Sequence, residues 1–273
     1  MTKPSIDVLV GVHNASRFLR ETLDALASQT YPNYRVLISD DCSTDTSFDI
    51  ARDYARHHSH FLVTRQMTNL GWMSNLNSLL EQASADYTCF VSHDDLVDPE
   101  YLSCLAHALY QDPQSVLAYA DMVDFYPDGL ERPRSAPFLA SKNRMERVAS
   151  LLSSREFWWA AYRGIVRRNI AQALPLKPNW AGQYKGDQTW LLSIAMEGSF
   201  AHVNRPLYKK RIHPGSVSNL WHYHAWNDLM ILLAMLGIVY RSRCQIAEKA
   251  RSTGIVLGIL WNFFQSSCRR RQH

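Results

Sequence analysis

The chain has 273 residues, of which 47% are hydrophobic and 20% charged, and its formal net charge is +4. This length fits one large domain, or one domain with a small appendage, and the composition is that of a globular protein with a sizeable core. The mild positive charge fits an anionic substrate or a membrane surface as well as nucleic acid, so it selects no partner by itself.

The cysteines and the apolar runs argue against several classes of protein. The five cysteines are odd in number and show no Cys-x-x-Cys spacing, which argues against a disulfide framework and a structural zinc site. We therefore expect a reducing, cytoplasmic compartment. The opening Met-Thr-Lys-Pro leads straight into an expected strand, without the pattern of a signal peptide. The longest apolar run, 229–240, is shorter than the about 20 residues that a bilayer-crossing helix needs.

In chain order, the first part of the sequence alternates between strand and helix patterns. Apolar strand segments are expected at 6–12, 35–39, 61–64 and 87–91, and each precedes a segment with apolar residues at helical spacing. Short connections between them predict a parallel, doubly wound sheet with right-handed crossovers. The chain has neither Gly-x-Gly-x-x-Gly after the first strand nor a Gly-x-x-x-x-Gly-Lys-Ser/Thr loop. Classical dinucleotide and P-loop sites are therefore disfavoured.

Paired carboxylates end two of these strands. Asp40 and Asp41 follow the second strand, and Asp94 and Asp95 follow the fourth. Open α/β sheets bind their ligands at the carboxyl ends of strands. Adjacent carboxylates repel each other unless a cation or donor holds them, and their oxygen atoms suit Mg²⁺ or Mn²⁺. For the pair after the fourth strand the alternative is a helix cap, because a Pro-Glu helix start soon follows.

The second half of the chain continues with strands and helices at less regular spacing. We expect a strand at 116–123, a mobile loop at 131–143, a helix at 145–153 and one or two strands at 200–212. Asp187 is expected to be the N-cap of a further helix. A helix N-terminus also keeps a carboxylate ionised and fixed, so capping and catalysis are compatible there.

Aromatic residues are dense in two segments of this half. The segment 157–162 contains Trp158 and Trp159 and is expected in the core, because large aromatic side chains dominate cores. The alternative is a platform for a ring-bearing ligand. The segment 179–187, with Trp180, is polar and contains glycine, as ligand-binding loops often do.

The remainder of the chain is predicted to be helical. Apolar stretches at 229–240 and 254–264 are separated by Arg241, Arg243 and a charged linker, and arginines recur at 269–271. One interpretation is a helical pair that packs on the domain. The other is a peripheral membrane contact, with apolar faces in the headgroup region and arginines on anionic lipid.

Several motifs, in their order and spacing, resemble glycosyltransferase family 2. They are Val8 to Asn14 (VLVGVHN), Asp40 to Asp45 (DDCSTD), Asn69 to Gly71 with Asn77, Ser92 to Asp95 (SHDD) followed by Pro99, Gly186-Asp187, and Tyr208 to Ser218. The resemblance covers about residues 5–218. It implies an α/β, GT-A fold with a Rossmann-like, mostly parallel sheet flanked by helices. Residues 1–218 would form this domain, with a nucleotide-binding half to about 115 and an acceptor half from 116, and 219–273 a C-terminal helical segment.

The resemblance also implies roles for the residues of the chemical step. Asp94 matches the family's metal-ligating aspartate, and His213 matches the C-terminal histidine that meets metal or diphosphate, so Mn²⁺ or Mg²⁺ is the implied cofactor. Asp187 matches the general base. The candidate acceptor contacts are Trp158, Trp159 and Trp180.

The implied nucleotide-sugar contacts follow the family with two departures. Asp40 or Asp41 would accept hydrogen bonds from the base and the ribose. His13 stands where the family usually has a tyrosine, and Ser92 where it usually has a ribose-binding aspartate. The other implied contacts are Gly11, Asn69, Gly71, Asn77, His93 and Asp95.

The sequence therefore predicts an inverting, metal-dependent glycosyltransferase. We expect a UDP- or dTDP-linked donor, a glycan or lipid-linked acceptor, and no nucleic acid. Surface-polysaccharide or lipopolysaccharide assembly at the inner face of the membrane is the expected setting, by analogy. Two alternatives stay open: a sugar-phosphate nucleotidyltransferase, although its glycine- and arginine-rich loop is missing, and a non-catalytic nucleotide-sugar-binding subunit, which Ser92 would suit.

Overall fold

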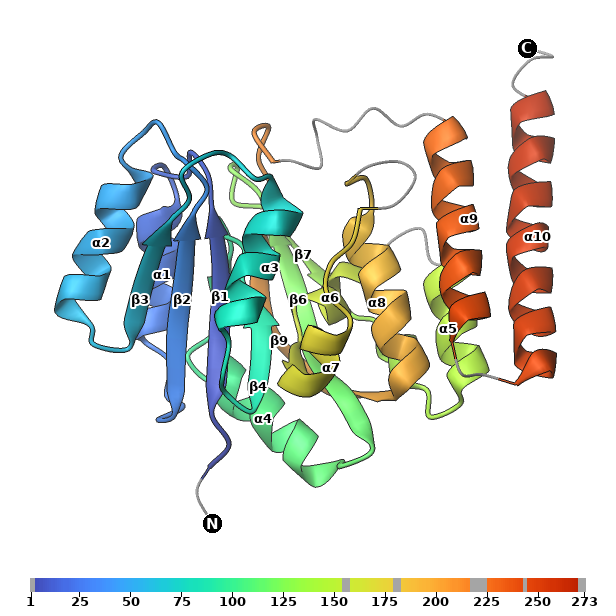
Figure 1. The fold of residues 1–273 in the computed structure, drawn as a ribbon, viewed down its shortest axis with the longest axis horizontal. Coiled ribbons are helices and arrows are strands. Elements are labelled where there is room, and N and C mark those ends of the chain that lie inside the picture. Colours follow the sequence, from blue (N-terminus) through green and yellow to red (C-terminus); the bar gives the residue numbers. More distant parts are fainter. Residues whose placement is uncertain (1–2, 154–157, 179–182, 217–224, 243–244, 270–273) are drawn as a thin grey trace.

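A computed structural model of the chain describes residues 3–153, 158–178, 183–216, 225–242 and 245–269. A central β-sheet carries helices on both of its faces, and two long helices lie at the C-terminal end (Figure 1). The α/β fold predicted from the strand and helix patterns is confirmed. Trp180, an expected acceptor contact, lies outside the described residues.

The first four strands form the parallel half of the sheet. β1 (Ile6–Val12) lies between β2 (Tyr34–Asp40) and β4 (Tyr87–Phe90), and β3 (Phe61–Arg65) pairs with the other side of β2. The order is β3-β2-β1-β4, so the strand order reverses at β1. Open α/β sheets bind ligands in the crevice that such a reversal leaves at the carboxyl ends of the strands.

Three amphipathic helices connect these strands. α1 (Leu19–Ala27), α2 (Ser47–His57) and α3 (Trp72–Gln82) each bury apolar side chains on the face that meets the sheet. Each helix begins within a short distance of the carboxyl end of the preceding strand. The polar residues between strand and helix therefore gather along one edge of the sheet.

Beyond β4 the sheet is mixed. β8 (Ile165–Arg167) runs antiparallel between β4 and β6 (Ser115–Phe125). β6 pairs in parallel with β9 (Ser199–Arg211), and β9 also pairs antiparallel with the short β5 (Leu96–Val97). The expected parallel arrangement therefore holds for the first four strands and for the pairing of β6 with β9, whereas β5 and β8 run antiparallel to their neighbours. The sequence did not predict β5 and β8, because strands of two or three residues are too short to show a hydrophobic period.

Of two expectations for the second half, one changes in detail and the other is confirmed. The segment 131–143, expected as a mobile loop, contains β7 (Glu131–Arg134), which pairs with β6, and a 3₁₀ turn (Pro137–Ala140) that buries Leu139. Its Pro, Arg and Ser content indicates a loop but does not reveal this pairing. The aromatic segment forms the short α6 (Trp158–Tyr162), and its buried side chains confirm the core interpretation there.

The C-terminal helices pack on the second half of the domain. α9 (Ala225–Arg241) contacts α8 (Gly186–Glu197), and α10 (Ile246–Arg269) contacts α9 and α5 (Arg144–Ser153). Within the described ranges, none of the helices combines the length and apolar character needed to cross a bilayer. Contact of this segment with a membrane surface stays a prediction.

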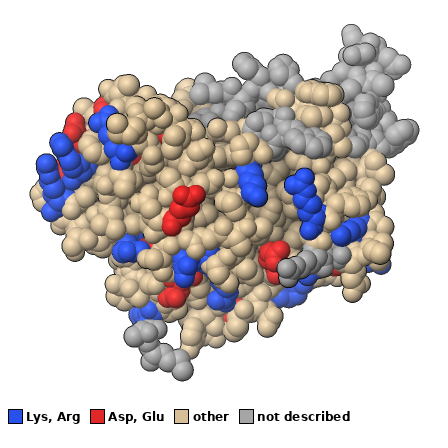
Figure 2. Space-filling view, in the orientation of Figure 1, with Lys and Arg blue, Asp and Glu red and all other residues tan. Residues whose placement is uncertain are grey.

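Charged side chains on the surface are interspersed. On the face drawn in Figure 2, basic and acidic residues alternate with wide uncharged areas.

One charged side chain, Asp7, is fully buried in the centre of the sheet. Its carboxylate accepts two hydrogen bonds from Arg35, at 2.9 and 2.8 Å, and two more from the backbone N–H groups of Ser84 and Ala85, at 2.8 and 2.9 Å. It therefore joins β1, β2 and the loop that leads to β4. Removal of a buried, fully bonded carboxylate leaves its donors unpaired, which is costly.

We expect Asp7→Ala to lower the free energy of unfolding by about 3–5 kcal/mol, because four donors lose their acceptor. Asp49→Ala is the matched control. Asp49 pairs with Arg52 at 2.9 Å with both side chains at least half exposed, so its loss should change stability by less than about 1 kcal/mol. Urea denaturation of the two variants measures both values. Equal stability losses in the two variants would contradict a structural role for the buried Asp7 carboxylate.

Candidate active site

The residues singled out from the sequence gather at the carboxyl ends of β1, β2 and β4. The ends of these strands and the loops that follow carry His13, the pair Asp40 and Asp41, and the run from Ser92 to Asp95. The start of α8 and the end of β9 bring Asp187 and His213 from the second half of the chain.

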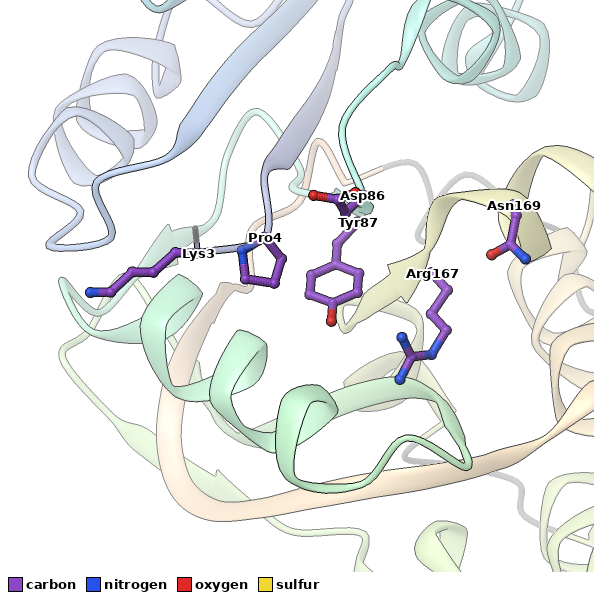
Figure 3. A pocket seen from close by; sticks show the side chains of 6 residues that line it. All are labelled: Lys3, Pro4, Asp86, Tyr87, Arg167 and Asn169. Carbon is purple, nitrogen blue, oxygen red and sulfur yellow. The ribbon is translucent and has the colours of Figure 1, made fainter. Parts of the chain in front are cut away.

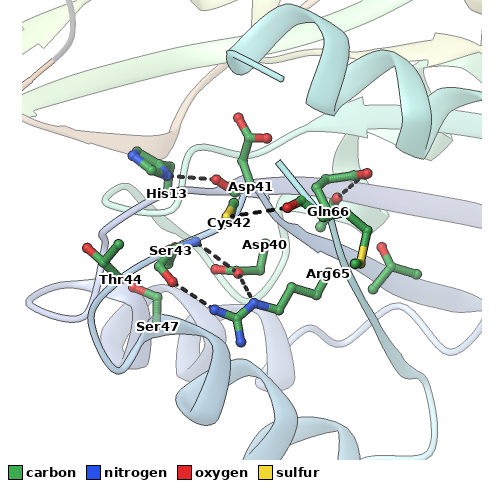
Figure 4. Close-up of polar contacts among 12 residues, drawn as sticks. His13, Asp40, Asp41, Cys42, Ser43, Thr44, Ser47, Arg65 and Gln66 are labelled. Atoms are coloured by element: carbon green, nitrogen blue, oxygen red, sulfur yellow. Dashed lines mark hydrogen bonds and ion pairs between the residues drawn. The ribbon is translucent and has the colours of Figure 1, made fainter. Parts of the chain in front are cut away.

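The two carboxylates after β2 are buried and have different partners (Figure 4). Asp40 Oδ2 accepts from the Ser43 backbone N–H at 3.1 Å and lies 3.2 Å from Arg65 Nε. Among the described residues, no group donates to Asp40 Oδ1, although that atom is buried. A buried acceptor without a donor is costly, so Asp40 Oδ1 is the better candidate for an acceptor of ligand N–H or O–H groups.

Asp41 shapes the next loop. Its two oxygen atoms accept from the backbone N–H groups of Leu70 and Gly71, at 2.7 and 2.9 Å. Gly71 has φ +79°, and a Cβ there would lie 2.7 Å from Gln183 Nε2. The Asp41 carboxylate thus holds the turn before α3 in a conformation that favours glycine.

His13 lies exposed beside this turn. Its Nδ1 donates to the Asp41 carbonyl at 2.8 Å, and its Nε2 lies 3.2 Å from Asn69 Nδ2, which donates to it. His13 and Asn69 therefore form one polar surface at the end of β1. The neighbouring Gly11 allows α3 to approach, because a Cβ at that position would lie 3.1 Å from Leu76.

The structure places Asn77 and His93 in contact with protein backbone. The Asn77 amide donates to the Leu176 carbonyl at 2.7 Å and accepts from the Leu176 N–H at 3.0 Å, which ties α3 to a distant segment. His93 Nδ1 donates to the Gly11 carbonyl at 3.1 Å. These contacts give Asn77 a structural role and lock His93 against the end of β1.

Asp94 and His213 form a close pair. Asp94 Oδ2 lies 2.9 Å from His213 Nε2, and both side chains are largely buried. Burial raises the pKa of Asp94, but the neighbouring imidazoles of His93 and His213 outweigh it and hold this pKa below its usual range. The carboxylate is therefore ionised near neutral pH.

The geometry of this pair fits a divalent cation. Adjacent ligands at about 2.1 Å from an octahedral ion lie about 3 Å apart, close to the observed separation. Over the described ranges no cluster of three or more His, Cys, Asp or Glu side chains could hold a metal ion. An ion at Asp94 and His213 would thus take its other oxygen ligands from substrate and water, as Mg²⁺ commonly does.

Asp95 faces away from Asp94, into the protein. It is 1% exposed and accepts from Arg163 Nε at 3.0 Å, the Tyr208 hydroxyl at 2.8 Å and the Arg211 N–H at 2.9 Å. All its contacts lie beneath the site, so the geometry gives no support to a direct ligand contact. The helix-cap alternative is wrong for Asp95, because α4 (Tyr101–Gln111) begins later, after Glu100.

Arg163 is a site residue that the sequence did not reveal. Its Nη2 donates to Ser92 Oγ at 2.9 Å while its Nε donates to Asp95. The chain therefore places a guanidinium beside the serine that replaces the family's aspartate. Gly164 makes this possible, because a Cβ there would lie 2.4 Å from the Ala118 carbonyl oxygen of β6.

Asp187 lies in the first turn of α8. The N-cap is Lys185, so the expected N-cap role of Asp187 is wrong by two residues. Asp187 Oδ2 accepts from the Trp158 indole N–H at 3.0 Å, and Oδ1 accepts from the Gln188 N–H at 2.9 Å. Trp158 is 8% exposed, so it serves to orient this carboxylate more than to offer an open ring face.

Lys210 is a second residue that the sequence did not reveal. Its Nζ lies 4.7 Å from the centre of the Trp159 ring and covers one face of that indole. Among the described residues, no acceptor lies within hydrogen-bond distance of its ammonium. The pKa of Lys210 is lowered by burial and by the nearby Arg163. Three neighbouring aspartates, including Asp187, raise this pKa but do not offset the lowering.

A cavity of about 360 Å³ lies elsewhere, at the amino-terminal end of β4 (Figure 3). It is lined by Lys3, Pro4, Asp86, Tyr87, Arg167 and Asn169. Tyr87 begins β4 and Arg167 ends the antiparallel β8, so the cavity opens at the sheet edge opposite Asp94. We assign it no part in the candidate site.

Comparisons with known proteins identify the family and the fold of the chain. The model of the glycosyl transferase family 2 matches residues 7–170. EpsH of Bacillus subtilis is 26% identical over 221 residues, which are 80% of this chain and 63% of EpsH. The chain thus spans less than two thirds of that relative.

Solved structures share the fold at low sequence identity. S. aureus TarS 1-349, in complex with UDP-GlcNAc, has a TM-score of 0.76 at 17% identity, over 94% of this chain and 71% of TarS. The mannosyltransferase PcManGT from Pyrobaculum calidifontis, in complex with GDP-Man and Mn²⁺, has a TM-score of 0.62 at 17% identity, over 93% and 69%. The predicted fold and family are both confirmed. The chain belongs to glycosyltransferase family 2 and has the GT-A fold.

Proposed function

We propose that the chain transfers a sugar from a nucleotide-diphosphate donor to a hydroxyl group of a glycan or lipid-linked acceptor, with inversion at the anomeric carbon. The observation that carries this proposal is the convergence of an Asp94–His213 pair and an oriented carboxylate, Asp187, at the carboxyl edge of the sheet. Neighbouring cations connect Asp94 electrostatically with Asp187. Arg163 lowers the pKa of Asp94 and that of Lys210, and Asp187 raises the pKa of Lys210.

Asp187 supplies the base of the reaction. An alcohol is a poor nucleophile near neutral pH, and a carboxylate within hydrogen-bond reach takes its proton as it attacks the anomeric carbon. The bond from that carbon to the diphosphate oxygen breaks in the same displacement. Trp158 holds one carboxylate oxygen in place, so the base keeps a fixed orientation. One base without a covalent intermediate gives inversion.

Asp94 and His213 would hold Mn²⁺ or Mg²⁺. When bound, such an ion neutralises the negative charge that the departing diphosphate gains. The Mn²⁺ complex of the structural neighbour PcManGT supports this choice. The UDP-GlcNAc complex of TarS supports a UDP-linked donor for this chain. Assembly of a surface polysaccharide at the inner membrane face stays a prediction.

Lys210 adds a fixed positive charge on the acceptor side of the same region. Its ammonium lies over Trp159 with a free hydrogen-bonding capacity within the described part of the chain. A cation in a partly desolvated site stabilises developing negative charge more strongly than it would in water. We assign Lys210 to the leaving diphosphate or to an anionic group on the acceptor.

One alternative has an observation behind it. Ser92 is uncharged, and its hydroxyl oxygen accepts a hydrogen bond from Arg163. This arrangement suits a chain that binds nucleotide sugars without turning them over. Donor hydrolysis in the presence of Mn²⁺ separates the two. Turnover supports an enzyme, whereas tight nucleotide binding without any turnover supports the non-catalytic alternative.

Asp187→Asn is expected to lower kcat by about 10²–10⁴-fold, because the amide accepts no proton, while donor affinity stays unchanged. Asp94→Asn is expected to weaken the Mn²⁺-dependent part of donor binding as well as kcat. Steady-state kinetics and calorimetric donor titration measure these effects. Full activity in either variant would remove that residue from its assigned role.

Lys210→Met is expected to lower kcat by about 10-fold or more, because a fixed charge beside the reacting groups is lost. Lys209→Met is the matched control. Lys209 is the next residue and half exposed, and it pairs with Glu131 at 3.0 Å on the outside of β9. Its kcat should stay within about twofold of the unmodified chain. Equal losses in the two variants would count against a catalytic charge at Lys210.

A further inference from the structure

The loop before α8 is joined to the C-terminal helix α9 by an ion pair. Lys185 Nζ lies 2.9 Å from Asp228 Oδ1, and the Tyr184 hydroxyl donates to the same oxygen at 3.3 Å. Asp228 lies in the first turn of α9, where the helix dipole favours a negative charge. Two consecutive side chains of the loop therefore converge on one carboxylate oxygen.

The backbone of Lys185 has an unusual conformation. Its φ is +48°, in the left-handed region that residues other than glycine, asparagine and aspartate rarely adopt. The N–H groups of Gln188 and Thr189 donate to the Lys185 carbonyl at 3.1 and 3.2 Å and form the first turn of α8. The conformation of Lys185 therefore sets the direction in which α8 starts. Asp187 is the second residue of that helix.

The other side of the helix start is held by α3. A Cβ at Gly186 would lie 1.7 Å from Met73 Cε, so a larger residue there would require the flexible end of the Met73 side chain to shift. The first turn of α8 is thus fixed between α3 of the first half and α9 of the C-terminal segment. The contact with α9 is partly shielded, since the side chains of Lys185 and Asp228 are 22% and 34% exposed.

We propose that Asp228 is a positioning residue for the catalytic base. Through Lys185 it stabilises the left-handed turn that aims Asp187 at the acceptor hydroxyl. The inference rests on the proposed function, because it takes Asp187 as the group that accepts the proton. A base displaced by about 1 Å can lose up to about 100-fold in rate. The C-terminal segment then belongs to the active site, although it contributes no group to the reaction.

A purely structural ion pair would hold α9 on the domain without affecting the base. The chain offers a matched comparison in the pair of Arg144 and Glu248, which joins α5 to α10 at 3.4 Å with side chains 38% and 22% exposed. Both pairs attach a C-terminal helix, but of the two only the pair at Asp228 involves the loop that leads into α8, the helix of the base. A structural role predicts the same effect for the two pairs.

The test compares kinetics of the full chain with a nucleotide sugar and Mn²⁺. Asp228→Ala and Lys185→Met are expected to lower kcat by about 10-fold or more, with KM for the donor within about twofold. Arg144→Met should leave both constants within about twofold. The charge-reversed double variant, Lys185→Glu with Asp228→Lys, should recover much of the lost kcat. Equal effects of Asp228→Ala and Arg144→Met, or no recovery in the double variant, would overturn the proposal.

Hydrogen exchange gives a readout that does not depend on activity. In Asp228→Ala the amides of Gln188 and Thr189 should exchange faster than in the unmodified chain, whereas Arg144→Met should leave them unchanged. Unchanged exchange in Asp228→Ala would refute the positioning role. If Asp187→Asn keeps full activity, the proposed base is wrong, and the exchange data still decide whether Asp228 holds this turn.

Discussion

The candidate site depends on the hydrogen bonds that the buried carboxylate of Asp95 accepts. It accepts hydrogen bonds from Arg163, Tyr208 and Arg211, which come from two segments far along the chain. Each of these bonds fixes the loop after β4 to the end of β9 or to the turn after α6. Because Asp95 points inward, its neighbour Asp94 points outward toward His213, which follows Arg211 by two residues. One buried acceptor thus aligns the proposed metal ligands.

The buried network also explains how the two halves of the chain cooperate. The parallel half provides an open edge at which strand ends present carboxylates, and the mixed half brings cations and aromatic side chains to that edge. Trp158 orients Asp187, and Lys210 lies over Trp159. The aromatic segment that could have been a ligand platform therefore serves mainly to place charged groups.

The sequence predicted the residues whose position follows from a strand end or from a family motif. Asp40, Asp41 and Asp94 are of this kind, because a carboxylate at the end of a buried strand has few other places to lie.

The sequence did not predict Arg163, since its partners Ser92 and Asp95 are 71 and 68 residues away and no local pattern links them. The left-handed Lys185 also gave no signal, because its conformation depends on contacts with α9 and not on residue type. The antiparallel β8 was not predicted, because a strand of three residues is too short to show a hydrophobic period.

The proposed reaction depends on a divalent ion that Asp94 and His213 would hold, and this ion would stabilise the leaving diphosphate. Calorimetric titration of UDP with and without Mn²⁺, on the unmodified chain and on His213→Ala, tests this most directly. We predict that Mn²⁺ strengthens UDP binding to the unmodified chain and that His213→Ala loses most of that gain. UDP binding that is the same with and without Mn²⁺ in both proteins would contradict the account.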